Sequence, residues 1–235
     1  MNQQTIIIPE KINDLKNKLK ESGTGWEDII NPYLDSESFY NTLHKLVDMV
    51  QDGTRFTPQM KDWFRSFETC HYDKLKVIFI GQDPYPQLGV ADGISFSCSK
   101  TMKEQPSLRH IFNSLEKQYP GYNRNPDLTR WSEQGVLMLN TALTVQINKI
   151  GSHYSLWHLF TTGLLNSLNK YPSQLVVVLL GKKAQEWQKL LLNHIVIQVE
   201  HPAAAAYKGG VWNDQDLFLK VNSILKDQGK SLIEW

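Results

Sequence analysis

Four short stretches of the chain are rich in apolar residues and end at polar or turn-forming residues. They cover positions 75–80, 135–139, 174–180 and 194–200. Their length and their content of leucine and β-branched residues predict β-strands. The second and third stretches are almost continuously apolar, which is typical of parallel strands that helices cover on both faces.

Segments with helical periodicity lie between these strands. We expect helices over 107–119, 155–169 and 182–192. Strands that alternate with helices in this way indicate an α/β fold in which a parallel sheet is connected by right-handed crossovers.

Before the first strand, apolar residues recur at helical spacing over about 70 residues. We expect breaks between the helices of this lead-in at Gly23-Thr24-Gly25 and at Asn31-Pro32. A second apolar stripe indicates packing in the core rather than a binding surface. The first pattern consists of Ile12, Leu15, Leu19, Phe39, Leu43, Leu46 and Val47, and the second stripe of Met60, Trp63, Phe64 and Phe67.

Polar side chains follow three of the predicted strands directly. Asp83 and Tyr85 come after the first strand, Asn140 ends the second, and His201 follows the fourth. Parallel strands end at one edge of their sheet, where ligands bind in α/β folds, so we expect these side chains to share a cleft. Prolines at 84 and 86 stiffen the first loop. Taken alone, such a loop is more often a simple turn with an aspartate cap.

Composition restricts the class of protein. The chain has 235 residues, of which 41% are hydrophobic, and no break in composition, so we expect a single domain over 1–235. It has no long apolar run and no export leader, so we expect no membrane span and an intracellular location, in the cytoplasm or in the nucleus of a eukaryotic host. Cys70 and Cys98 are expected to be reduced thiols. With the seven histidines scattered, we expect no structural metal site.

A formal net charge of +1 gives only weak support for a polyanionic partner. A local basic patch remains an alternative to lysines that only solubilise the surface. Its candidate residues are Lys100, Lys103, Arg109, Lys182, Lys183 and Lys208.

Several motifs, in their order along the chain, resemble those of the family 1 uracil-DNA glycosylases. The resemblance extends from Lys76 to Trp235 and implies a single three-layer α/β/α domain around a four-stranded parallel sheet. The motifs are Gly81-Gln82-Asp83-Pro84-Tyr85, Gly93-Ile94-Ser95-Phe96-Ser97, Gln105-Pro106-Ser107-Leu108, Trp131-x-x-Gln134-Gly135-Val136, Leu137-Met138-Leu139-Asn140-Thr141 and His201-Pro202.

Cleavage of a bond between deoxyribose and a base builds positive charge on the sugar and negative charge on the base. The resemblance implies that Asp83 orients the attacking water and stabilises the sugar cation, and that a neutral His201 donates a hydrogen bond to uracil O2. A histidine before a proline at a strand end is, by itself, more often structural. Its expected neighbours Asp83 and Asn140 favour the catalytic role.

Selection of uracil requires groups that read the edge of the base and exclude a methyl group. The Asn140 amide offers both a donor and an acceptor to O4 and N3–H. By resemblance, Tyr85 packs against C5, Phe96 stacks on the base, and the Gln82-Asp83 backbone adds contacts. Taken singly, Phe96 is better explained as a core residue and Asn140 as a turn residue at a strand end.

The target base is reached only outside the helical stack, so contacts to the DNA backbone are needed around the cleft. The resemblance implies that Pro106 and Ser107, ahead of a helix, hold a phosphate. Ser107 fits a helix N-cap as well. Lys208 is a further candidate for a phosphate contact.

The chain departs from the family pattern in two places. The family's His-Pro-Ser-Pro-Leu-Ser is His201-Pro202-Ala203-Ala204-Ala205-Ala206 here, and the family's histidine after the tyrosine is absent. Ala203 replaces the phosphate-binding serine, and Ala205 replaces the leucine that enters the vacated stack. Apolar wedges offset the cost of unstacking. We therefore expect a preference for single-stranded DNA unless Tyr207 enters the groove, and we expect Ala205→Leu to favour duplex DNA. Pro86 stands in place of the histidine and changes the hydrogen bonding near the water.

The sequence thus predicts a monomeric glycosylase without metal or cofactor that releases uracil from DNA. One alternative is a DNA-binding or replication-accessory protein on the same fold. Another is an α/β enzyme for a small nucleotide or phosphate ester, although the sequence contains no glycine-rich phosphate motif. Protein partners and inhibitors are not predictable from the sequence.

Overall fold

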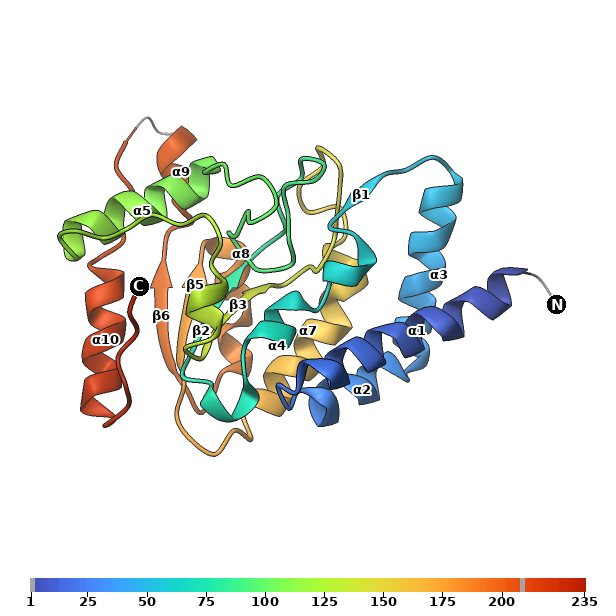
Figure 1. The fold of residues 1–235 in the computed structure, drawn as a ribbon, viewed down its shortest axis with the longest axis horizontal. Helices are drawn as coiled ribbons and strands as arrows, with labels where there is room; N and C mark the ends of the chain where they lie inside the picture. Colours follow the sequence, from blue (N-terminus) through green and yellow to red (C-terminus); the bar gives the residue numbers. More distant parts are fainter. Residues whose placement is uncertain (1–2, 208–209) are drawn as a thin grey trace.

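The computed structural model describes residues 3–207 and 210–235, with the side chains of 3–7 and 206–207 left aside. Its centre is a four-stranded sheet with the order β3-β2-β5-β6, and all neighbouring pairs are parallel (Figure 1). The predicted α/β class with a four-stranded parallel sheet is confirmed. The strands are β2 (Val77–Gly81), β3 (Val136–Asn140), β5 (Val176–Leu180) and β6 (Ile195–Val199).

Helices cover both faces of this sheet and make the three layers (Figure 1). The chain passes from β2 outward to β3 and then returns to β5 on the other side of β2. Such a reversal of strand order leaves a crevice beyond the carboxyl ends of the strands. The connecting and terminal helices are α5 (Pro106–Gln118), α6 (Thr129–Ser132), α7 (Tyr154–Leu168), α8 (Lys182–Gln185) with η3 (Glu186–Leu190), α9 (Pro202–Tyr207) and α10 (Leu217–Asp227).

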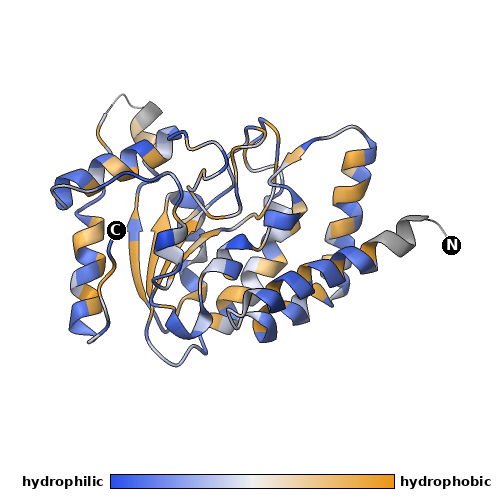
Figure 2. Ribbon diagram, in the orientation of Figure 1, coloured by the Kyte–Doolittle hydropathy of each residue, from blue (hydrophilic) through white to orange (hydrophobic). Residues whose placement is uncertain are grey.

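The strands alternate their side chains between two hydrophobic cores. In β2, Ile78 and Ile80 join a core with the lead-in helices and α7, whereas Val77 and Phe79 join a core with α5 and α10. This alternation follows from the two-residue repeat of a strand. Figure 2 accordingly shows a sheet that is mostly hydrophobic, apart from part of β6, between helices that carry both hydrophobic and polar residues.

The lead-in is mainly helical and packs on the core that contains Ile78 and Ile80. The expected break at Asn31-Pro32 is wrong, because α2 continues through Pro32 to Leu34. The second apolar stripe packs on the core as expected, with Met60 partly buried and its other three residues fully buried, but it does not form one helix. Met60 lies in η1, Phe67 in α4, and Trp63 and Phe64 between them. The elements are α1 (Gln3–Ser22), α2 (Glu27–Leu34), α3 (Glu37–Gln51), β1 (Phe56–Thr57), η1 (Met60–Asp62), α4 (Arg65–Thr69) and η2 (Tyr72–Lys74), and β1 pairs with β4 (Val145–Gln146).

Two helices differ from the sequence expectation. The helix expected over 182–192 is interrupted, since α8 changes after Gln185 to the tighter η3. The short helix α9 was not predicted. Its four consecutive alanines are strong helix formers, which explains why this loop becomes helical. Over the described parts of the chain, none of the helices has the length and apolarity that crossing a membrane requires.

Candidate active site

A cavity of about 330 Å³ opens at the carboxyl edge of the sheet. The register of the strands explains why distant residues meet here. Gly81 at the end of β2 is paired with Asn140 at the end of β3, so the Asp83 loop begins beside Asn140. The sequence-predicted residues on the cavity wall are Gln82, Asp83, Tyr85, Phe96, Pro106, Ser107, Asn140, His201 and Ala203.

Asp83 presents one bound and one free carboxylate oxygen. Its Oδ2 accepts hydrogen bonds from the backbone N–H of Gly151 at 2.9 Å and from the side-chain amide of Gln82 at 2.8 Å. Its Oδ1 is buried and has no hydrogen-bond partner among the described residues. Burial raises the pKa of the Asp83 carboxyl above its ordinary value, and the two bonds to Oδ2 oppose this rise. The carboxylate is therefore held in one orientation, and its Oδ1 can still accept a hydrogen bond.

The Asn140 amide is fixed by a neighbouring hydroxyl. Ser95 Oγ donates to Asn140 Oδ1 at 2.8 Å. The close approach depends on Gly81, because a Cβ at this position would lie 2.7 Å from Asn140 Oδ1 and 2.9 Å from Ser95 Oγ. The amide orientation that results leaves Nδ2 as a donor, while Oδ1 retains a second lone pair.

Phe96 and Tyr85 form a joined part of the wall. The Tyr85 hydroxyl donates to the Phe96 carbonyl at 2.9 Å. Phe96 has a φ of +64°, in a region that bulky residues rarely adopt. Its ring centroid lies 5.6 Å from that of His201, at an interplanar angle of 39°. Strained backbone of this kind persists only where its surroundings impose it, and it is concentrated at ligand sites.

The structure determines which nitrogen of His201 carries the proton. The Ala203 N–H donates to His201 Nδ1 at 3.1 Å, so His201 caps the start of α9 as an acceptor. Burial lowers the pKa of His201 to about 4, so the ring is neutral at pH 7 and its proton is on Nε2. Gly181, directly after β5, leaves space for the His201 side chain, since a Cβ at position 181 would lie 2.7 Å from the His201 Cβ.

The start of α5 forms another side of the cavity. Pro106 is the first residue of this helix, Ser107 the second, and Gln105 occupies the N-cap position without a side-chain capping bond. The structure therefore excludes Ser107 as the N-cap. The free N–H groups of the first turn lie at the cavity wall, where they favour an anion.

The segment after His201 contributes less to the cavity than expected. Ala203 lines it, but Ala205 is only 6% exposed and packs in the core beside α5. A longer side chain at position 205 would press on this core instead of reaching a ligand. The Tyr207 side chain and all of Lys208 lie outside the described residues.

Acidic neighbours neutralise half of the candidate basic patch. This pairing favours a solubilising role over a concentrated positive field for these three residues. Lys100 pairs with Asp62, Arg109 Nε lies 3.9 Å from Glu104 and Lys183 Nζ lies 2.8 Å from Glu186.

Sequence reasoning missed two groups that shape the site. One is Gly151, whose N–H orients Asp83 and whose φ of +79° suits glycine, so a turn signal was present in the sequence. The other is Ser95, which lies in a quoted motif but gave no sign of its bond to Asn140. Both contacts join segments that are distant in the sequence, which local patterns do not reveal.

The fold and the cavity define a three-layer α/β/α protein with an acid, an amide and a neutral imidazole around one site. Residues 67–226 match the family model of the uracil DNA glycosylase superfamily. Among curated relatives, "Uracil-DNA glycosylase 1" of Listeria innocua is 34% identical over 214 residues, covering 89% of this chain and 96% of that protein. "Uracil-DNA glycosylase" of Amoebophilus asiaticus is 35% identical over 212 residues, with coverages of 87% and 96%.

Solved structures lead to the same family. The crystal structure of mimivirus uracil-DNA glycosylase superposes with a TM-score of 0.80 at 26% identity, covering 89% of this chain and 85% of that one. A mimivirus UNG variant, Y322L, solved in complex with UGI, has a TM-score of 0.81 and covers 89% of this chain and 87% of that one, also at 26% identity. The chain belongs to the uracil DNA glycosylase superfamily, and the predicted family and enzyme class are confirmed.

Proposed function

We propose that this protein hydrolyses the N-glycosidic bond of deoxyuridine in DNA, releasing uracil and leaving an abasic site. The observation that carries this proposal is that two groups with complementary properties line the same cavity. Asp83 has a free, buried carboxylate oxygen, and His201 is a neutral donor at Nε2. In the transition state the sugar becomes positive and the base becomes negative. The Asp83 carboxylate suits the first charge and the His201 donor the second.

Asp83 acts on the sugar side of the bond. Its negative charge stabilises the cation that develops as the bond to the base lengthens. Oδ1 accepts a hydrogen bond from the attacking water and takes up its proton as the new C1′–O bond forms. The bonds from Gly151 and Gln82 to Oδ2 keep the carboxylate in this orientation.

His201 acts on the departing base. The C1′–N1 bond breaks with its electron pair moving to uracil, and the negative charge reaches O2. The Nε2–H of His201 donates to this oxygen without transferring its proton. A neutral ring is sufficient, because the backbone bond to Nδ1 fixes its tautomer and burial keeps it uncharged.

The amide and the aromatic residues select the base. Asn140 Nδ2 donates to uracil O4, and Oδ1 accepts from N3–H with its remaining lone pair. Cytosine presents the opposite pattern at these two positions. Tyr85, held by its bond to Phe96, occupies the space that the methyl group of thymine would need, and Phe96 stacks on the ring.

The DNA must present its base outside the stack. The start of α5, at Pro106 and Ser107, holds a phosphate, with Ala203 beside it on the cavity wall and Lys208 as a further contact. We expect the enzyme to act as a monomer. It prefers single-stranded DNA, because α9 places an alanine in the core where the family has its wedge.

Uracil release from a labelled single-stranded oligonucleotide tests this proposal. Free base is identified by mass spectrometry, and the abasic site by alkaline cleavage. We expect release from a uracil-containing strand and none from matched strands that carry cytosine or thymine at that position. Asp83→Asn is the inactive control.

Two other outcomes would contradict the proposal. DNA binding without release of any base would indicate a replication-accessory role. Absence of both DNA binding and release would favour an enzyme for small nucleotides.

A further inference from the structure

One carboxylate near the cavity has no part in the mechanism above. Asp92 is completely buried and does not line the cavity, although residues on both sides of it do. A buried charge is expensive unless partners satisfy it, so its presence in this loop calls for a physical reason.

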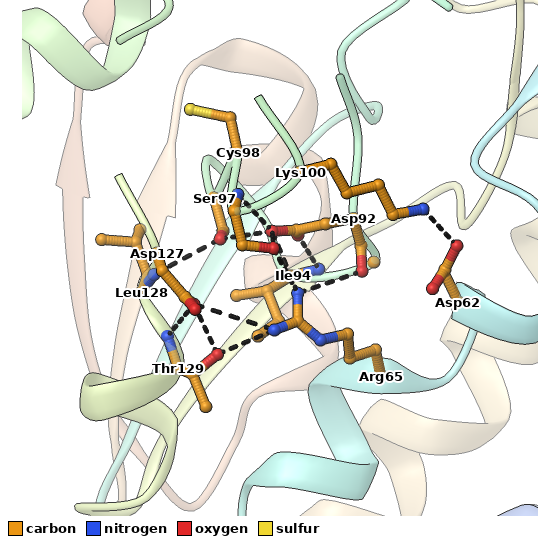
Figure 3. A network of polar contacts seen from close by, with 12 residues as sticks. Asp62, Arg65, Asp92, Ile94, Ser97, Cys98, Lys100, Asp127, Leu128 and Thr129 are labelled. Carbon is orange, nitrogen blue, oxygen red and sulfur yellow. Dashed lines mark hydrogen bonds and ion pairs between the residues drawn. The ribbon is translucent and has the colours of Figure 1, made fainter. Parts of the chain in front are cut away.

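Five donor groups surround the Asp92 carboxylate, in the network that Figure 3 shows. Oδ1 accepts from the backbone N–H of Ile94 at 3.0 Å. Oδ2 accepts from the Ser97 hydroxyl at 2.6 Å and from the N–H and hydroxyl of Ser99 at 2.9 and 2.6 Å, and it lies 3.0 Å from Arg65 Nη1. The carboxylate therefore closes residues 92–99 into a ring around itself.

Arg65 attaches this ring to the rest of the protein. Its Nη2 donates to Thr129 Oγ1 at 2.9 Å and lies 3.7 Å from Asp127 Oδ1, ahead of α6 (Figure 3). The loop also presses on η1 at Gly93, where a Cβ would lie 1.9 Å from the Asp62 carbonyl oxygen. The position of the loop is thus set by α4, η1 and the start of α6.

The same loop presents the groups that read the base. Ser95 Oγ holds the amide of Asn140 by a bond of 2.8 Å. The carbonyl of Phe96 receives the Tyr85 hydroxyl at 2.9 Å, and the Phe96 ring lies against His201. Ser95 and Phe96 lie between Ile94 and Ser97, both of which bond to Asp92, so Asp92 controls the backbone that carries them.

We propose that Asp92, paired with Arg65, is the positioning residue for base recognition: it folds the 92–99 loop so that Ser95 aligns Asn140 and Phe96 holds Tyr85. This inference rests on the proposed function, because it assigns the selection of uracil to the loop. A carboxylate suits the task since it accepts at all its lone pairs, and the loop offers it donors from several directions.

Three variants separate positioning from general stability. Asp92→Asn keeps the shape of the side chain but replaces one acceptor oxygen with an NH2 group. This new donor would face the donors that surround position 92. Asp62→Asn is the matched control, because the Asp62 side chain pairs with Lys100, directly after the loop, and is away from the cavity wall. Ser95→Ala removes only the bond to Asn140. Folding of each variant is checked by near-UV circular dichroism and thermal melting.

The measurements are kcat and KM on a single-stranded uracil oligonucleotide, inhibition by free uracil, and release of thymine from a matched strand. For folded Asp92→Asn we expect kcat/KM to fall about 10- to 100-fold and the inhibition constant of uracil to rise by a similar factor. Ser95→Ala should reproduce part of both changes, and the double variant should lose less than the sum of the two single effects. Thymine release relative to uracil release should increase, and Asp62→Asn should leave all three quantities unchanged.

A folded Asp92→Asn protein with wild-type kinetics and uracil inhibition would overturn the proposal. An equal loss in Asp62→Asn would do the same, since it would indicate a general effect of loop stability. If Asp92→Asn does not fold, Ser99→Ala, which removes one hydroxyl from Oδ2, must show the rise in the uracil inhibition constant for the proposal to stand. A wild-type protein that releases no uracil would instead overturn the proposed function, and this inference with it.

Discussion

The loop over residues 82–99 and the segment that follows His201 border the same cavity but are built differently. In the first, side-chain and backbone hydrogen bonds hold nearly every group that would touch the base. In the second, α9 begins at the His201 cap and consists largely of alanines, with Ala205 in the core. In the proposed function, recognition and chemistry thus depend on a rigid wall, whereas the described side chains of the segment after His201 are small and offer little to insert into a duplex.

This difference teaches that excision of a base and its extraction from a helix are separable tasks. The first requires donors and acceptors at fixed positions, and the cavity has them. The second requires apolar surface that offsets the cost of unstacking. Changes in the cavity should therefore affect all DNA substrates equally, whereas a change in α9 should affect duplex DNA selectively only where the new side chain reaches the DNA.

Asp83→Asn is expected to have the largest effect on the cavity side of this comparison. It removes the negative charge and the proton acceptor, so kcat should fall about 1,000-fold on both single strands and duplexes. Steady-state kinetics on the two substrates measures it. The folded pKa of Asp83 is raised, so its charge destabilises the protein at neutral pH, and Asp83→Asn should melt at a higher temperature. Normal uracil release by this variant would refute the assignment.

His201→Ala is expected to come next, with a loss in kcat of about 100-fold and no change in base selectivity, because one donor to the departing anion is lost. Since the helix α9 also loses its cap, thermal melting serves as the control for folding. A loss confined to KM would show that His201 binds the base without stabilising the anion.

Some features of the site could be predicted from the sequence and others could not. The strand ends at Asp83, Asn140 and His201 could be predicted because apolar runs locate strands and parallel strands end together. The tautomer of His201 and the role of Gly151 could not be predicted, because they arise from contacts between loops. The helix break expected at Pro32 is wrong, because α2 continues through this residue. Tertiary packing can hold a helix together at a proline that the local sequence alone would treat as its end.

Tyr85→Ala should change selectivity more than rate. Without the ring, the space next to C5 admits a methyl group, so the ratio of uracil to thymine release should fall about tenfold or more. Competition between two oligonucleotides that differ only at this base measures the ratio. Complete rejection of thymine by the variant would show that another residue excludes the methyl group.

Acid should lower the stability of the folded protein, because His201 is buried in its neutral form. Its pKa is about 4 in the folded protein and near the ordinary 6.5 when unfolded, so the unfolded state binds more protons between these values. Stability should therefore be lost as the pH falls from about 6.5 to about 4. His153, also buried with a pKa lowered to about 4, should contribute in the same direction. Urea unfolding between pH 4 and 7 should show a shallower dependence in His201→Gln; an unchanged slope would contradict the buried neutral ring.

Ala205→Leu should have the smallest effect on catalysis. The sequence alone favours a gain on duplex DNA, but position 205 is 6% exposed and packed beside α5. Overpacking of this kind costs about 1–3 kcal/mol of stability. We therefore expect a lower melting temperature and little change in the ratio of duplex to single-strand activity. A selective gain on duplexes would show that this side chain does reach DNA.

The most direct test of the whole account is the ratio of kcat/KM for uracil release from a single strand and from the duplex of the same sequence, at one salt concentration. An intact base-reading cavity joined to an alanine-rich α9 predicts release from both, with the single strand clearly faster. Equal or faster release from the duplex would contradict the contrast between the two regions, and no release from either would contradict the assignment of the cavity itself.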